Sequence, residues 1–211
     1  MSNLHPYYLQ TMGIETWVVR EKATQDKLPN HLNLLQEKVS NCNKCPLHKT
    51  RRQTVFARGN EKASLMLIGE APGFYEDKQG LPFVGKAGQL LNQMMEAIGL
   101  SENDIYIANV LKCRPPDNRD PLPEEIVHCS SYLKEQIDYV KPQLILALGR
   151  FAGQFLMNQM APLKDLRNKI HSFQNIPFIV TYHPAYLLRN PQDKKKAYSD
   201  LLFAKQNLKD N

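Results

Sequence analysis

Four short apolar runs, separated by segments with the apolar spacing of helices, constrain the fold of this 211-residue chain most strongly. The runs lie at residues 65–68, 105–110, 144–148 and 178–182. A strand that is apolar along its whole length is buried on both faces, which is typical of a parallel sheet covered by helices. The alternation therefore predicts the α/β class, a three-layer α/β/α sandwich around a central four-stranded parallel sheet.

The length of the chain suits one domain with a complete hydrophobic core. We expect this domain to span residues 29–211, with an extension of unknown role at residues 1–28. The extension contains Tyr7, Tyr8 and Trp17, which suit a segment that covers the domain or binds a protein partner. Helices are expected after Pro29, at about residues 86–98, from Pro123 onward, and at about 150–158 and 193–208.

Charge and hydropathy patterns bear on the partners and the location of the protein. The 27 Lys and Arg residues exceed the 21 Asp and Glu residues, so the formal net charge is +6. This mild excess agrees with a polyanionic partner but is common in proteins that bind none. No run approaches the roughly 18 apolar residues of a membrane span, and residues 1–10 lack a secretion signal. We therefore expect a cytoplasmic protein without membrane contact.

The connection at residues 69–88 joins the first predicted strand to the following helix and contains five glycines and two prolines. Glycine allows sharp turns and exposes backbone N–H groups, and such loops after buried strands often hold ligands. Glu70, Asn109 and His183 each follow or end a different predicted strand. Because ligands bind at the carboxyl ends of parallel strands, these residues predict one ligand site. The alternative is a simple connector with solvated acids.

Other polar and aromatic groups suit the same ligand, although each also has a structural alternative. Phe83 could stack on a flat ring or belong to the core, and the Asn109 carboxamide could recognise a base edge or cap a strand. Leu187 and Leu188 follow His183 in an expected loop, where they either wedge into a ligand or pack on the core. The candidate phosphate contacts are Lys86, Arg114, Arg119 and Arg189. Together these groups indicate a pocket for a planar, hydrogen-bonding ring attached to a polyanion.

The four cysteines, Cys42, Cys45, Cys113 and Cys129, suggest a metal site because cytosolic proteins rarely keep disulfides. Four thiolates can hold either zinc or a 4Fe–4S cluster. The wide separation of the second pair differs from the tight pairs of zinc ribbons and favours iron–sulfur. Buried free cysteines and a redox-active Cys-x-x-Cys pair are the alternatives.

Three segments resemble the signatures of the family 4 uracil-DNA glycosylases. Residues 69–88 resemble the first motif of that family, and residues 109–116 and 183–189 resemble the other two. The four cysteines are similar to the cluster ligands of the family in spacing and order. The resemblance covers roughly residues 30–205. Phe74 and Tyr75 depart from it, because they are bulky where the family often has small or acidic residues.

The resemblance implies a monofunctional DNA-repair hydrolase that removes uracil from single- or double-stranded DNA by cleaving the N-glycosidic bond. It implies a 4Fe–4S cluster on the four cysteines and a uracil base flipped into the pocket. We expect the enzyme to act as a monomer. A non-catalytic iron–sulfur nucleic-acid-binding or sensor protein is the main alternative, and an electron-transfer protein is another.

The resemblance also implies a role for each site residue. Phe83 would stack on the base, Asn109 would read its edge, and His183 would donate a hydrogen bond to uracil O2. Glu70, with the backbone of Ala71 and Gly73, would flank the base and the sugar. The remaining expected contacts are Glu76 to the base, Leu187 and Leu188 in the gap left in the DNA, and Lys86, Arg114 and Arg189 to the DNA backbone. The motif lacks an aspartate that some relatives use to activate water, so Glu70 is the hypothetical general base.

Overall fold

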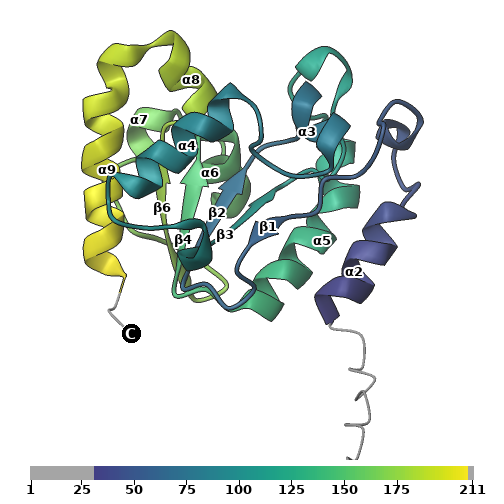
Figure 1. Cartoon of the computed structure of the whole chain (residues 1–211), viewed down its shortest axis with the longest axis horizontal. Helices are drawn as coiled ribbons and strands as arrows, with labels where there is room; N and C mark the ends of the chain where they lie inside the picture. Colours follow the sequence, from purple (N-terminus) through teal and green to yellow (C-terminus); the bar gives the residue numbers. More distant parts are fainter. Residues whose placement is uncertain (1–30, 209–211) are drawn as a thin grey trace, which may run out of the picture. The chain divides into compact units, whose positions relative to one another are not determined.

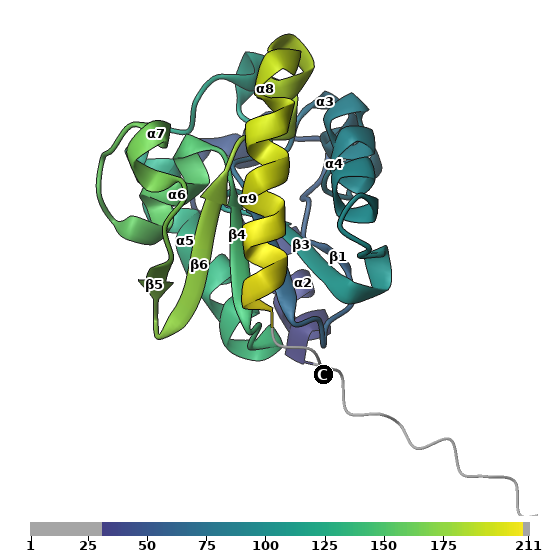
Figure 2. The same ribbon diagram turned by 90° about the vertical axis from the view of Figure 1, so that its left-hand side faces the viewer.

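The computed structural model describes residues 31–208, which form one sheet of six strands covered by helices on both faces (Figures 1 and 2). The predicted extension at residues 1–28 lies outside the described residues. The strands are β1 (Arg58–Gly59), β2 (Leu65–Gly69), β3 (Ile105–Asn109), β4 (Leu144–Leu148), β5 (His171–Phe173) and β6 (Ile176–Thr181). They lie in the order β1-β3-β2-β4-β6-β5.

The four predicted strands form the parallel centre of the sheet, which confirms the α/β class. In the register, Leu65 of β2 pairs with Ile105 of β3 and with Leu144 of β4, and Ile145 pairs with Phe178 of β6. The sheet differs from the prediction at its edges, where β1 and β5 add antiparallel strands. These strands are two and three residues long and are only partly buried, so they leave no apolar run in the sequence.

Helices cover the two faces of the sheet and give the expected three layers. They are α2 (His31–Ser40), α3 (Phe74–Gln79), α4 (Lys86–Glu96), α5 (Pro123–Val140), α6 (Arg150–Met157), α7 (Leu163–Leu166), α8 (Pro184–Arg189) and α9 (Lys194–Asn207). Short 3-10 helices lie at Pro46–Lys49, Glu102–Asp104, Pro116–Asn118 and Pro191–Asp193. Within the described residues, no helix is long and apolar enough to cross a membrane.

The apolar core divides into two parts, one on each face of the sheet. Met66 and Ile68 of β2 pack into the part that contains residues of α2, α5 and α6. Leu65 and Leu67, which alternate with them, pack into the part that contains residues of α4 and α9. This division follows from the alternation of side chains along a strand, and it explains why all five residues of β2 are buried.

Candidate active site

A cavity of about 460 Å³ opens at the carboxyl ends of β2, β3 and β6. It brings together nine predicted residues, namely Glu70, Ala71, Gly73, Glu76, Phe83, Asn109, Arg119, His183 and Arg189. The loop at 115–120 also lines the cavity, through Pro115, Asn118, Arg119 and Asp120. The predicted DNA contacts Lys86, Arg114, Leu187 and Leu188 are not among the lining residues.

Asn109 presents an unpartnered polar group to the cavity. It is the last residue of β3 and pairs in register with Gly69 at the end of β2. Its Oδ1 atom is buried and has no hydrogen-bond partner among the residues that the structure describes. Such a group costs roughly 1–3 kcal/mol of stability, which a ligand that donates a hydrogen bond would offset. A Cβ atom on Gly69 would lie 2.3 Å from this oxygen, so glycine is needed here.

Phe83 forms an apolar wall of the cavity. Its backbone has a φ of 55°, and its ring lies 5.7 Å from the ring of His183 at an interplanar angle of 33°. The backbone amides of Val84 and Gly85 both donate to Glu76 Oε1 at 3.0 Å. The Glu76 carboxylate therefore holds the turn after Phe83, a role that the sequence did not indicate.

The local hydrogen bond of His183 sets its tautomer. His183 caps α8, and its Nδ1 accepts a hydrogen bond from the Ala185 amide at 3.1 Å. Burial lowers the pKa of His183 to about 4, and the charge of Arg189 acts in the same direction. The ring is therefore neutral at pH 7. Because Nδ1 is an acceptor, the ring proton resides on Nε2, which makes Nε2–H a hydrogen-bond donor.

The carboxyl group of Glu70 is poised for proton exchange near neutral pH. Burial raises its pKa to about 7; the nearby Asp120 adds to the rise and Arg150 opposes it. A group with this pKa changes between acid and base at neutral pH. Perturbed carboxyl groups in a cleft are common at catalytic sites.

The loop at 115–120 is the part of the cavity wall that the sequence identified least well. Arg119 forms a two-pronged ion pair with Glu125, at 3.0 and 2.6 Å, and Glu125 also accepts from the Leu122 amide at 2.8 Å. These contacts fix the loop to the start of α5. Arg119 was predicted as a phosphate contact, but its guanidinium already has a partner. Asp120 is not among the predicted site residues, although its position shortly after the motif at residues 109–116 is a usable signal.

The segment after His183 differs from the prediction, because it forms α8 rather than a loop. Leu187 is 1% exposed and belongs to the core under α4 and α9. This burial favours the alternative that Leu187 packs on the core over the expected contact with DNA. Leu188 is 45% exposed and remains available for contact. Lys86 is the exposed first residue of α4.

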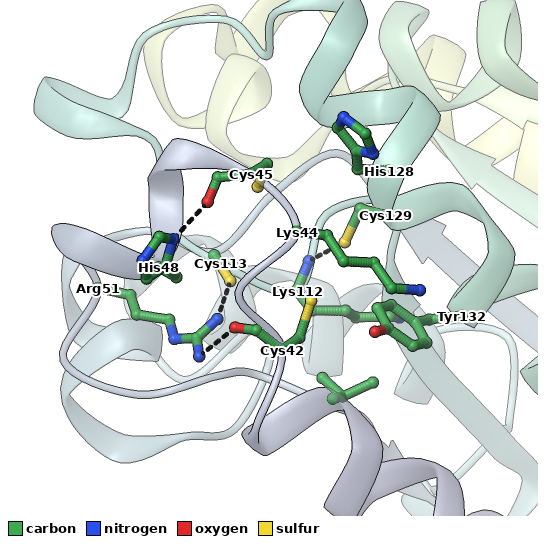
Figure 3. A pocket seen from close by; sticks show the side chains of 11 residues that line it. Cys42, Lys44, Cys45, His48, Arg51, Lys112, Cys113, His128, Cys129 and Tyr132 are labelled. Carbon is green, nitrogen blue, oxygen red and sulfur yellow. Dashed lines mark hydrogen bonds between the residues drawn. The ribbon is translucent and has the colours of Figure 1, made fainter.

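The four cysteines surround one small pocket (Figure 3). Cys42 and Cys45 lie between α2 and the following 3-10 helix, Cys113 follows β3, and Cys129 is on α5. Within residues 31–208, no three His, Cys, Asp or Glu side chains form a group that could hold a single metal ion. A 4Fe–4S cluster has one cysteine on each iron, so its four thiolates surround the cluster instead of converging on one ion.

Hydrogen-bond donors and cations around the thiols fit an anionic group. Arg51 Nη1 donates to Cys113 Sγ at 3.1 Å, and the Lys112 amide donates to Cys129 Sγ at 3.2 Å (Figure 3). Burial raises the pKa of the thiols of Cys45, Cys113 and Cys129. Buried thiolates therefore need positive charge nearby, and the residues present fit an iron–sulfur cluster.

Lys112 connects the cysteine pocket to the cavity. Its buried ammonium group donates to the carbonyl oxygen of Asn109 at 2.8 Å and to Gln136 Oε1. Burial lowers its pKa to about 8, and the thiols of Cys129 and Cys113 oppose that shift. One lysine thus contacts a thiol through its backbone and the Asn109 backbone through its side chain.

These features define an α/β protein with a polar ligand pocket at the carboxyl ends of its parallel strands and a four-cysteine site beside it. The family model of the uracil DNA glycosylase superfamily matches residues 56–205. The chain belongs to this superfamily.

Several type-4 uracil-DNA glycosylases are similar to the chain over most of its length. The enzyme from Archaeoglobus fulgidus is 44% identical over 177 residues, which cover 80% of this chain and 89% of the relative. The enzyme from Pyrobaculum aerophilum is 42% identical, with 81% and 91% covered. The enzyme from Thermotoga maritima is 42% identical, with 75% and 84% covered. The resemblance to this family is confirmed.

Proposed function

We propose that the chain is a uracil-DNA glycosylase that hydrolyses the N-glycosidic bond between uracil and deoxyribose in base excision repair. The observation that carries this proposal is the buried, unpartnered Oδ1 of Asn109, which shares a cavity with the neutral ring of His183. The similarity to relatives that are type-4 uracil-DNA glycosylases supports it.

The hydrogen-bonding pattern of uracil suits this pair of groups. The Asn109 Oδ1 accepts from uracil N3–H, and the amide nitrogen of the same carboxamide donates to O4. His183 Nε2–H donates to O2. Phe83 stacks on the flipped base. Cytosine carries an acceptor at N3 and a donor at N4, so the same carboxamide orientation rejects it.

His183 stabilises the leaving base electrostatically. Cleavage of the glycosidic bond leaves negative charge on uracil, and a fixed donor at O2 binds that charge more strongly than it binds the neutral base. Because the pKa of His183 is about 4, the ring serves as a neutral donor rather than as an acid. Preorganisation by the Ala185 amide keeps this donor in place.

Glu70 acts on the sugar side of the bond. Its carboxylate stabilises the cationic sugar or takes the proton of the attacking water, for which its pKa of about 7 is suitable. Ala71 and Gly73 line the same wall of the cavity, and Glu76 supports that wall through the Val84 and Gly85 amides. Arg189, which lines the cavity, and the more distant Arg114, Lys86 and Leu188 contact the DNA strand.

Cys42, Cys45, Cys113 and Cys129 would hold a 4Fe–4S cluster. A cluster bound there would link the segment after α2, the segment after β3 and the helix α5 covalently, and its binding would contribute folding free energy. The Arg51 guanidinium and the Lys112 backbone amide, which donate to the thiols of Cys113 and Cys129, support this assignment. The enzyme acts as a cytoplasmic monomer, and any partner of residues 1–28 would bind outside the described residues.

Uracil release from a single-stranded oligonucleotide with one central uracil tests the proposal. The protein should release uracil without strand cleavage and should leave a matched oligonucleotide with cytosine at that position intact. His183→Ala should lower the rate constant of the chemical step by about 100- to 1,000-fold, the usual effect of removing one such donor. The exposed His31 on α2 provides a control, because His31→Ala should retain full activity.

If protein whose four cysteines have not been oxidised releases no uracil, the proposal is contradicted. That result would favour a non-catalytic nucleic-acid-binding protein. Equal losses of DNA binding and chemistry in His183→Ala would contradict the electrostatic role of His183.

A further inference from the structure

Two large aromatic side chains lie exposed beside the cavity. Phe74 is 44% exposed and Tyr75 is 56% exposed, at the first two positions of α3. Their rings make an edge-to-face contact, with centroids 5.4 Å apart and an interplanar angle of 85°. These are the two positions at which the sequence departs from the family pattern.

Two arginines from other segments flank the Phe74 ring. The guanidinium carbon of Arg52 lies 5.6 Å from the ring centroid, and that of Arg114 lies 5.3 Å from it. Arg114 Nε also donates to Asn118 Oδ1 at 2.8 Å. Within residues 31–208, no carboxylate forms an ion pair with either guanidinium. Both charges therefore remain available to an anionic ligand.

This group, which we call the Phe74 platform (Arg52, Phe74, Tyr75 and Arg114), adjoins the uracil pocket. Gly73 and Glu76, which line the cavity, bracket the two aromatic residues in the sequence. Asn118, the hydrogen-bond partner of Arg114, also lines the cavity. A ligand that enters the pocket as part of a longer chain would therefore have its neighbouring units close to the platform.

Exposed aromatic rings combined with unpaired arginines suit an unstacked nucleotide. The π-face of a base stacks on an aromatic side chain whatever the base, and arginine adds cation–π and phosphate contacts. We propose that the Phe74 platform is a binding subsite for the nucleotide next to the flipped uracil, with the base of that nucleotide stacked on Phe74. This inference rests on the proposed function of the pocket.

The subsite favours single-stranded DNA. In a duplex, the neighbouring base is already stacked and paired, so moving it onto Phe74 would break those contacts. In a single strand, the base is free to stack on Phe74. The contact then strengthens binding without breaking the stacking and pairing contacts of a duplex. The platform therefore contributes to the affinity for single strands more than to the affinity for duplexes.

Kinetics of Phe74→Ala test this subsite directly. On a single-stranded oligonucleotide with one uracil, the variant should raise KM by about 5- to 150-fold, the range expected for loss of one base–aromatic stack. On the same oligonucleotide in a duplex, the increase should be less than about 2-fold. Phe74→Trp should keep the KM of the unaltered protein, because the larger ring also stacks on a base. Tyr198→Ala is the matched control, since Tyr198 on α9 has the same 44% exposure and is not among the residues that line the cavity.

A substrate that lacks the neighbouring base separates stacking from a general structural effect. Two oligonucleotides carry an abasic tetrahydrofuran residue next to the uracil, one on its 5′ side and one on its 3′ side. Only one of the two should raise the KM of the unaltered protein. With Phe74→Ala, the abasic residue should cause no further increase in KM. Equal KM increases on single strands and duplexes, or an abasic penalty that persists in Phe74→Ala, would overturn the proposal.

Binding measurements keep this test independent of the enzymatic activity. Fluorescence anisotropy with a single-stranded oligonucleotide that contains thymine instead of uracil should show weaker binding by Phe74→Ala than by the unaltered protein. If the unaltered protein releases no uracil, the proposed function fails, whereas the anisotropy comparison still decides whether Phe74 binds a base. Unchanged anisotropy would overturn the platform alone.

Discussion

The dependence of activity on pH tests the role of Glu70. With a pKa of about 7, its carboxyl group is about 1% ionised at pH 5 and about 90% ionised at pH 8. If the carboxylate is the active form, the rate constant for uracil release should rise roughly 100-fold over this interval and level off above pH 8. A glutamate with an ordinary pKa near 4.3 would give less than about a 2-fold rise.

The assay is single-turnover release of uracil from a saturating oligonucleotide between pH 5 and pH 8.5. His183 does not titrate in this window because its pKa is about 4, so the slope reports on Glu70. Glu70→Gln should lower the plateau and flatten the profile. Glu96→Gln, at an exposed position on α4, should keep the profile of the unaltered protein. A flat profile in the unaltered protein, or a slope that survives in Glu70→Gln, would refute the reasoning.

Three further outcomes are expected from the packing around the cavity and the thiols. Lys112→Met leaves two buried carbonyl oxygens without their donor and should lower the free energy of unfolding by about 2–4 kcal/mol in urea titrations. The control Lys134→Met, at an exposed position, should change this free energy by under about 0.5 kcal/mol. Gly69→Ala brings a Cβ atom within 2.3 Å of Asn109 Oδ1, so kcat/KM should fall by at least about 10-fold while secondary structure measured by circular dichroism is kept. Cys113→Ser should abolish the visible absorption of a bound iron–sulfur cluster, and an unchanged spectrum would exclude Cys113 as a ligand.

The centre of the fold was predictable because burial on both faces leaves a continuous apolar run. β2, β3, β4 and β6 are each apolar along nearly their whole length, and their identification required no tertiary information. The edge strands and the short helices α3, α7 and α8, which have four to six residues each, were missed for a physical reason. A strand of two or three residues has no measurable period, and α8 begins with a proline, Pro184, which suits a loop equally well.

The site was predictable to the extent that topology determines it. Glu70, Asn109 and His183 end or follow parallel strands, so they had to meet at one edge of the sheet. The sequence could not indicate which atoms would find partners. The hydrogen bond to His183 Nδ1, the backbone role of Glu76 and the burial of Leu187 depend on distances that only the folded chain sets.

The spacing within residues 109–113 joins the two sites of the protein. Asn109 reads the base in our proposal, and Cys113, four residues later, belongs to the thiol pocket. Between them, Lys112 donates through its ammonium group to the Asn109 carbonyl and through its amide to Cys129 Sγ. A displacement of the thiol pocket therefore moves the segment that holds the Asn109 carboxamide. Because catalytic rates fall steeply with displacements of about 1 Å, we expect changes in the thiol pocket to alter the rate of uracil release through the position of Asn109.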